Sequence, residues 1–442
     1  MAWGIGSLAL CYGWGIRVVN AVLSTALTAS EGSIFSISTT VSRSDGASMR
    51  INKTSSNITG QLYRSGLTAT ANQGSTIIFG IATGWTSGKT MILFPGVGGL
   101  YGLGDIGIRN DGGTYKLGIY SLSATPVWEG SFGLTVSNTA GVPDQWYAIN
   151  ICHLNPTPGS NSLYWQHSYQ IMEAGSTTVE ERSPWINVGQ GGVSYSTIDS
   201  FGISLAEGGG GSTVETPDIF IDGFAVVTGG VFGPADIKFE TVVPSADGTD
   251  AGWTEVGDGD GAKWDELIPA YAGGDDDDTT YISGTTTPYS AAHAGFTALT
   301  GSDEEFALQG YFRGRVTVAG GVVNGRMRSG TATVSGSLLA LSATSYAWGF
   351  TQPFVRSTLT SPQGLGGDGG SPWTTALMDA AEWGVASFLG TASNKRCTGL
   401  ALQRMFGLPF QDTDPVNGMT TMRELDPAFT GHTASRRVRE AT

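Results

Sequence analysis

Short runs in which apolar and polar residues alternate recur along most of the chain. Each run is rich in β-branched or aromatic residues and is bounded by Gly, Asn, Asp, Pro or Ser, which is the pattern of β-strands. In the first half of the chain these runs are 33–41, 75–82, 104–109, 115–120, 146–153 and 163–171. The turn sequence Asn110-Asp111-Gly112-Gly113 joins two of them and predicts a hairpin. This half is therefore predicted to be all β.

The strand pattern is interrupted where a domain boundary is expected. Runs at 198–205 and 218–227 close the first series, and the chain restarts at 231 after Gly229-Gly230. Later runs are 306–319, 325–329, 331–334, 345–351 and 397–405. We predict a first domain over 1–228, a second over 229–409 and an extended C-terminal arm over 410–442, in which Pro residues break any regular element.

A single segment has the period of a helix. Ser371 suits the N-cap position and Pro372 the first helical position. Apolar residues then recur three or four positions apart, at Trp373, Leu377, Ala381, Val385 and Phe388. The spacing predicts a helix over 372–388, in the second domain.

Composition agrees with an all-β chain. The 442 residues include 67 Gly and 17 Pro, and only 14% are charged, against about 25% in an average protein. Gly costs about 1 kcal/mol at each helical position, so long helices are disfavoured. The predicted fold class is all-β: two β-sandwich domains, one short helix in the second, and an irregular C-terminal tail.

The charge balance excludes two classes of partner. Lys and Arg number 23 and Asp and Glu 38, so the net charge is −15, which repels nucleic acid and anionic membranes. The apolar N-terminus lacks a basic start and reaches Arg17 too early for a span of about 20 residues, so neither a signal peptide nor membrane insertion is expected. The scattered Cys11, Cys152 and Cys397 predict buried thiols rather than a disulfide framework.

Two glycine motifs resemble nucleotide-binding signatures in residue pattern but not in their predicted structural context. Segment 84–90 (GWTSGKT) has three residues between its glycines where a phosphate-binding loop needs four, and a strand follows it instead of a helix. Gly102-x-Gly104-x-x-Gly107 leads into the hairpin, again not into a helix. Both predict turns between strands, so no nucleotide cofactor is expected.

Catalytic signatures are also incomplete. No G-x-S-x-G elbow occurs, and the four histidines contain no H-x-x-x-H pair; His153 and His167 are interpreted as structural residues. Sandwich glycosidases of the laminarinase type carry E-x-D-x-x-E on one strand. The single E-x-D here, Glu424-Leu425-Asp426, has Phe429 at the position of the second Glu. The chain is therefore predicted not to be an enzyme.

The acidic region 244–284 holds the candidate metal ligands. Asp258-Gly259-Asp260-Gly261 and the run Asp275-Asp276-Asp277-Asp278 offer carboxylate oxygens on flexible backbone, as Ca²⁺ prefers. The EF-hand pattern is not met, because Ala262 and Lys263 stand where it requires Asp or Asn and then Gly. The candidate calcium ligands are Asp258, Asp260, Asp275, Asp276 and Asp277; the alternative is a solvated acidic loop.

The first domain resembles concanavalin-A-like, or laminin-G-like, jelly rolls. The stretches that carry the resemblance are GASMRI at 46–51, DQWYAINI at 144–151 and DIFIDGFAV at 218–226. Alternate residues of such strands fill the space between two sheets. Lectins of this kind often hold calcium beside a sugar site, but no matching ligand set is present, so the resemblance assigns no sugar-binding residue.

The second domain resembles a module of tailed-bacteriophage structural proteins. The matching stretches are WDE at 264–266, DDDDTTYI at 275–282, RMRSG at 326–330, YAWGF at 346–350 and the Trp373–Val385 segment. The family implies a virion component without catalytic residues, assembled in the bacterial host cytoplasm. Its partners would be capsid or tail proteins and copies of itself.

Three functions remain open at this point. The first is a non-enzymatic virion structural protein, tail-associated or a surface appendage or decoration. The second is a lectin-like protein of the virion that binds a host glycan or receptor. The third is a glycoside hydrolase, which only the fold favours.

Overall fold

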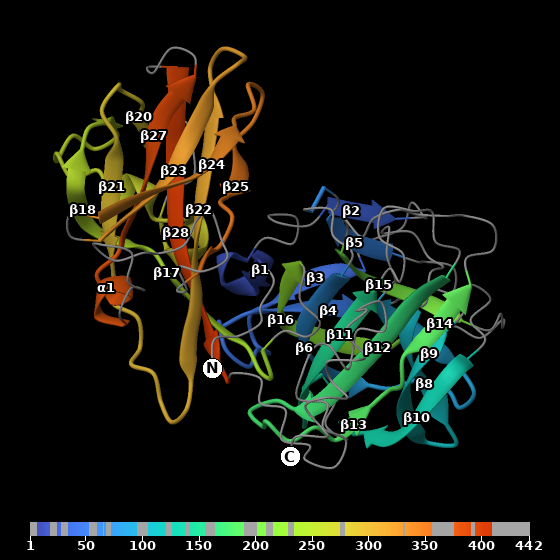
Figure 1. Cartoon of the computed structure of the whole chain (residues 1–442). Coiled ribbons are helices and arrows are strands. Elements are labelled where there is room, and N and C mark those ends of the chain that lie inside the picture. The colour runs from blue at the N-terminus through green and yellow to red at the C-terminus, as the bar shows by residue number, and fades with distance from the viewer. Residues whose placement is uncertain are drawn as a thin grey trace. The chain divides into compact units, whose positions relative to one another are not determined.

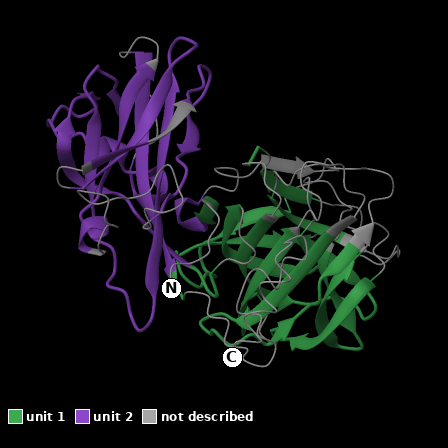
Figure 2. Ribbon diagram, viewed as in Figure 1, with its two compact units in different colours: residues 1–12, 23–237, 407–442 green, residues 13–22, 238–406 purple. Residues whose placement is uncertain are grey.

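The computed structural model of the chain describes most of its residues. The described ranges are 7–17, 24–27, 34–52, 60–64, 66–67, 72–94, 105–120, 126–137, 141–154, 164–189, 201–208, 215–228, 234–274, 279–329, 332–355, 375–389 and 394–408. They fold as an all-β protein with two compact units, which Figure 2 shows in separate colours. Asp275, Asp276 and Asp277 and the predicted arm over 410–442 lie outside the described residues.

Unit 1 comprises 1–12, 23–237 and 407–442 and contains two antiparallel sheets. The first has the order β13-β12-β11-β6-β16-β4-β3, with β1 beside β16 and β14 beside β12 (Figure 1). Its strands are β1 (Ser7–Gly13), β3 (Phe35–Ser38), β4 (Ser48–Asn52), β6 (Asn72–Thr83), β11 (Trp146–Leu154), β12 (Tyr164–Glu173), β13 (Glu181–Arg182), β14 (Ile186–Gly189) and β16 (Asp218–Thr228).

The second sheet of unit 1 has the order β10-β9-β8-β7-β15-β5-β2. Its strands are β2 (Ser24–Leu27), β5 (Gly60–Arg64), β7 (Thr90–Phe94), β8 (Asp105–Asp111), β9 (Thr114–Tyr120), β10 (Pro126–Leu134) and β15 (Phe201–Gly208). Aromatic rings join the two sheets: Phe79 of β6 lies 5.9 Å from Phe94 of β7, centroid to centroid. Alternation places such residues between the sheets, which makes this unit a β-sandwich.

The first glycine motif is a turn between strands, as predicted, and the second is described only at its last glycine. Segment 84–90 connects β6 to β7, where the Lys89 amide donates to the Thr86 carbonyl and Gly88 adopts a φ of +85°. In the second motif Gly107 lies within β8, which pairs with β9 through the Gly112-Gly113 turn, and Gly102 and Gly104 lie outside the described residues. The described part of each motif therefore belongs to a strand or to a turn between strands.

Unit 2 comprises 13–22 and 238–406 and also contains two antiparallel sheets. One has the order β19-β20-β28-β22-β25, with β17 beside β28 and β26 beside β22; the other has the order β18-β21-β27-β23-β24. The strands of the first are β17 (Lys238–Val242), β19 (Thr254–Val256), β20 (Tyr281–Ser283), β22 (Glu304–Val316), β25 (Ala347–Phe350), β26 (Phe354–Val355) and β28 (Lys395–Gly407). Those of the second are β18 (Pro244–Ala251), β21 (Tyr289–His293), β23 (Val322–Ser329), β24 (Ala332–Ala340) and β27 (Glu382–Leu389).

Trp383 of β27 is at the centre of the unit 2 core. Its side chain is fully buried, and its indole N–H donates to the Tyr311 carbonyl of β22 at 2.9 Å. A Cβ added to Gly310 or Gly325 would approach this indole to 2.3 and 2.4 Å. Those two glycines therefore leave the space that the large ring fills.

The predicted helix over 372–388 is wrong in its extent. Within the described part of this segment, which begins at 375, the structure has a helix only at α1 (Thr375–Asp379), and strand β27 replaces the second half of the predicted helix. Ser371, Pro372 and Trp373 lie outside the described residues. Trp383 and Val385 point to the core with period two, and Gly384 packs so closely that a Cβ there would lie 1.9 Å from the Tyr289 carbonyl oxygen of β21. Pairing of β27 with both β21 and β23 outweighs the apparent helical period.

The expectation of one short helix in this part of the chain is confirmed. The described residues otherwise contain the 3-10 turns η1 (Trp14–Ile16), η2 (Asp265–Leu267) and η3 (Ala270–Ala272).

The chain passes from unit 1 to unit 2 after residue 237, although the sequence pattern restarts at 231. Specific contacts hold the intervening segment on unit 1. Asp236 forms an ion pair with Arg43, and the Thr76 hydroxyl donates to the Pro234 carbonyl at 3.1 Å. Within the described residues no helix is long and apolar enough to cross a membrane.

Candidate functional site

An acidic loop in unit 2 lies between β19 and η2 and contains two of the predicted metal ligands. Asp258 and Asp260 come together there with Asp265, with one carboxylate oxygen of each within 4.8 Å of the others. A second group shares Asp258 and adds Glu255 and Glu266 at the same spacing. The loop thus gathers five carboxylates, of which Glu255, Asp265 and Glu266 were not among the predicted ligands.

Glycine and backbone amides set the shape of this loop. Gly259 and Gly261 have φ values of +77° and +89°, which residues other than glycine rarely adopt. Their amides donate to the two oxygens of the Glu255 carboxylate at 2.7 and 2.9 Å. Asp258 accepts in turn from the Asp260 amide at 3.1 Å. The loop therefore wraps around Glu255 and holds the aspartates side by side.

Crowded carboxylates change the protonation of the loop. Burial, followed by the charges of Asp265, Asp258 and Glu255, raises the pKa of Glu266 to about 7. Burial and the charge of Asp260 likewise raise the pKa of Asp265. Glu266 is only 6% exposed. A divalent cation at this position would offset the carboxylate repulsion that adds to the effect of burial on both pKa values.

The donor set fits Ca²⁺, which takes six to eight oxygen ligands at about 2.3–2.6 Å. Two oxygens bound to one such ion are at most about 5 Å apart, so the 4.8 Å limit that both carboxylate groups satisfy is compatible with a shared ion. Asp258 belongs to both groups and would be the central ligand.

Millimolar calcium is expected to raise the thermal midpoint of unfolding by about 5–10 °C if the ion is present at about 100 times its dissociation constant. The increase should be larger at pH 8 than at pH 6, because Glu266, with a pKa of about 7, must lose its proton to act as a ligand. Differential scanning fluorimetry with calcium and with a chelator measures both effects.

The Asp258→Asn variant should lose most of this calcium response. The matched control is Asp111→Asn, which removes a surface aspartate of unit 1 that pairs with Lys116 at 2.8 Å. If calcium and chelator give the same midpoint at both pH values, the loop is merely solvated and the calcium hypothesis is wrong.

A second cluster lies inside unit 1 and involves the two histidines interpreted as structural. His153 and His167 stand opposite each other on β11 and β12, and their Nδ1 atoms are 2.6 Å apart. Both are buried, which lowers the pKa of His153 to about 4, and burial together with His153 lowers the pKa of His167 well below its usual value. Neutral rings that share one hydrogen bond tie the two strands together.

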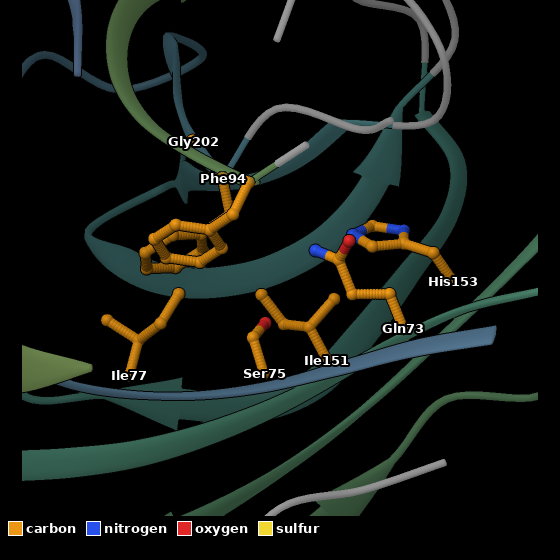
Figure 3. A pocket seen from close by; sticks show the side chains of 8 residues that line it. Gln73, Ser75, Ile77, Phe94, Ile151, His153 and Gly202 are labelled. Atoms are coloured by element: carbon orange, nitrogen blue, oxygen red, sulfur yellow. The ribbon is translucent and has the colours of Figure 1, made fainter. Parts of the chain in front are cut away.

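His153 also lines a small hollow between the sheets of unit 1. Figure 3 shows its ring beside the Gln73 amide, with Phe94 across the hollow. The volume that water-sized molecules can occupy is about 10 Å³, which is room for about one water molecule. The hollow is therefore a packing gap rather than a substrate site.

Several carboxylates outside the loop accept hydrogen bonds that hold strands and turns. Glu181 accepts from the Ser131 and Phe132 amides and from the Tyr169 hydroxyl. Glu382 accepts from the Thr249 amide at 2.8 Å and the Ser290 hydroxyl at 2.6 Å. These acids stabilise the framework.

Comparisons with known proteins find likeness only among solved structures. No protein-family model matches the chain, and no curated protein sequence matches it. Lectin II from Ulex europaeus is 13% identical, with 50% of this chain and 99% of the lectin covered and a TM-score of 0.32. Cellulose induced protein Cip1 is 11% identical, with 49% and 96% covered and a TM-score of 0.31. Domain 4 of AbnA, an extracellular arabinanase from Geobacillus stearothermophilus solved with arabinotriose, is 12% identical, with 51% and 95% covered and a TM-score of 0.31. The function therefore has to be argued from the chain's own residues.

Proposed function

We propose that this chain is a non-enzymatic structural protein of a tailed-bacteriophage particle, associated with the tail or the particle surface. It assembles in the bacterial host cytoplasm, as a homo-oligomer and with other virion proteins. Nucleic acid and membrane lipid are not among its partners, in keeping with the net charge of −15.

The position of the motif residues in unit 2 is the observation that supports this function. Trp383 and Met327 lie in the core, and Arg328 of β23 pairs at 3.2 Å with Asp250 of β18, a strand of the same sheet. Two of the stretches that resemble phage proteins, RMRSG and the described part of 373–385, thus contribute to the framework of the unit. A protein whose distinctive residues serve its framework acts through its outer surfaces.

Analysis of purified particles tests the proposal. In a bacterial strain that encodes this chain within a prophage, induction should yield density-gradient particles that contain it at a fixed ratio to the major capsid protein, measured by quantitative mass spectrometry. If the chain is present in the lysate but missing from the particles, the proposal is wrong. Turnover of a polysaccharide or an ester by the purified chain would contradict the non-enzymatic part.

Binding of a host-surface glycan is the second candidate function. The feature that favours it is a group of half-buried aromatic residues beside arginines on one sheet face of unit 2, including Tyr346 and Trp348. Aromatic surfaces of this kind are uncommon away from binding sites.

A further inference from the structure

One face of the β19-β20-β28-β22-β25 sheet gathers basic and aromatic side chains. Arg313 and Arg315 stand two residues apart on β22, with Phe312 and Val316 buried on the opposite side. Arg313 is directly opposite Trp348 on β25. Because side chains alternate across a strand, these arginines and the tryptophan share one face. Arg396 of β28 and Tyr281 of β20 extend it across the sheet.

Stacking on aromatic rings holds the three guanidinium groups in place. Arg313 and Arg315 lie 5.1 and 5.0 Å from the centroid of the Tyr346 ring. Arg396 lies 4.4 Å from the centroid of the Tyr281 ring. Such cation–π contacts reduce the number of orientations that a planar guanidinium adopts. The guanidinium groups are therefore partly ordered before a ligand binds, which lowers the entropy cost of binding.

Trp348 lies against the backbone of β28 at a glycine. A Cβ added to Gly399 would come within 3.3 Å of the indole and within 3.3 Å of Arg313 Cβ. The side chain of Trp348 is half-buried, and the neighbouring Thr398 hydroxyl accepts from Arg313 at 3.0 Å. The absence of a side chain at Gly399 thus lets a large ring lie beside an ordered guanidinium.

We propose that this basic–aromatic face, formed by Tyr281, Arg313, Arg315, Tyr346, Trp348 and Arg396, binds an oligosaccharide that carries carboxylate groups. Guanidinium forks pair with carboxylates through two parallel hydrogen bonds, and an indole offers a flat apolar surface for a sugar ring. The chain as a whole has a net charge of −15. Three arginines on one face nevertheless attract an anionic ligand locally and orient it.

The position of the face within the sheet favours a sugar over an acidic peptide strand. Peptides that bind sheets usually pair with a free edge. The three arginines belong to β22 and β28, each of which has a neighbouring strand on both sides, whereas β25, which carries Trp348, is an edge strand of the sheet. The basic part of the face therefore offers side chains and no open row of backbone groups. This inference names the site and ligand class of the second candidate function and does not depend on the chain being a virion protein.

Calorimetric titration of the full-length chain tests the proposal. The probes are defined oligomers of galacturonate, mannuronate and sialic acid, together with carboxyl-reduced, neutral forms of the uronate oligomers. At least one acidic oligomer should bind, and its neutral form should bind at least tenfold more weakly. Raising the salt concentration should weaken binding, since the contacts are partly exposed.

Variants locate the site. The double variant Arg313→Gln, Arg315→Gln should weaken binding at least tenfold while keeping the thermal midpoint of the wild type. The single variant Trp348→Ala should weaken binding by a similar factor with a lower thermal midpoint, because its half-buried ring packs against β28. The matched control is Arg109→Gln, which removes a half-exposed arginine of unit 1 that pairs with Glu129 at 3.0 Å, and should bind like the wild type. A conservative Arg313→Lys variant separates the effect of paired hydrogen bonds from the effect of positive charge alone, because lysine keeps the charge but cannot form two parallel hydrogen bonds with a carboxylate.

Three results would overturn the proposal. These are binding of none of the acidic oligomers, unchanged binding by the double variant, or equal affinity for a poly-glutamate peptide, which would make the face a docking surface for acidic proteins. None of them changes the outcome of the particle analysis, so a failure here is separate from a failure of the virion function.

Discussion

Replacing Arg404 by methionine is expected to lower the free energy of unfolding of unit 2 by about 3–5 kcal/mol. Arg404 is 1% exposed and contacts Glu305, which is also buried, at 3.1 Å, together with Glu240 on the neighbouring β17. Its guanidinium also lies 4.7 Å from the centroid of the Phe296 ring. Methionine fills similar space but leaves the Glu305 carboxylate buried without its cation.

Urea denaturation of the full chain, followed by amide hydrogen exchange in β22 and β28, measures this loss for unit 2 separately. The double variant Arg404→Met, Glu305→Met removes both charges and should recover a large part of it, because an apolar pair can replace a buried ion pair. A single-variant loss below about 1 kcal/mol would show that the ion pair does not stabilise the unit.

Acidification from pH 7 to pH 4 is expected to destabilise unit 1 by about 3 kcal/mol through His153 alone. In the unfolded chain a histidine has a pKa near 6.5, whereas burial lowers the pKa of His153 to about 4 in the folded state. Between these values the unfolded chain binds a proton that the folded chain does not. The stabilisation is therefore complete above pH 6.5 and lost as the pH falls towards 4, by about 1.4 kcal/mol for each pH unit.

Urea titrations at a series of pH values, with β11 and β12 monitored by hydrogen exchange, measure this dependence. The double variant His153→Gln, His167→Gln should flatten the curve between pH 6.5 and 4, while exchange in β28 of unit 2 provides the internal control. If the variant and the wild type have the same slope in this range, the pair is not the pH-sensitive element.

Short-range patterns predicted most of the strands and turns. Alternation marks β11 and β16, and Asn110-Asp111-Gly112-Gly113 marks the β8–β9 hairpin, because side-chain period and turn chemistry depend on neighbouring residues. The same local context correctly assigned segment 84–90 to a turn. Adjacent acidic residues also indicated the loop at Asp258 and Asp260, since two ligands close in sequence remain close in space.

Contacts between distant strands could not be predicted in this way. The segment after Asp379 has apolar residues at helical spacing, yet it forms β27 because β21 and β23 supply partners on both sides. Glu266 was missed as a candidate ligand because no local motif shows that it turns back towards Asp258. Burial of its own side chain in the folded protein, followed by the charges of Asp265, Asp258 and Glu255, raises its pKa to about 7.

The sequence by itself determined the all-β class, the lack of recognisable catalytic motifs and the acidic character of one loop, because composition and short periods carry that information. Only the tertiary structure brought His153 to His167, Arg404 to Glu305, and Arg313 and Arg315 to the ring of Tyr346. Each of these contacts joins residues that pairing or packing of the folded chain brings together. The register of a strand and the packing of a sheet are properties of the whole fold, and they decide which side chains meet.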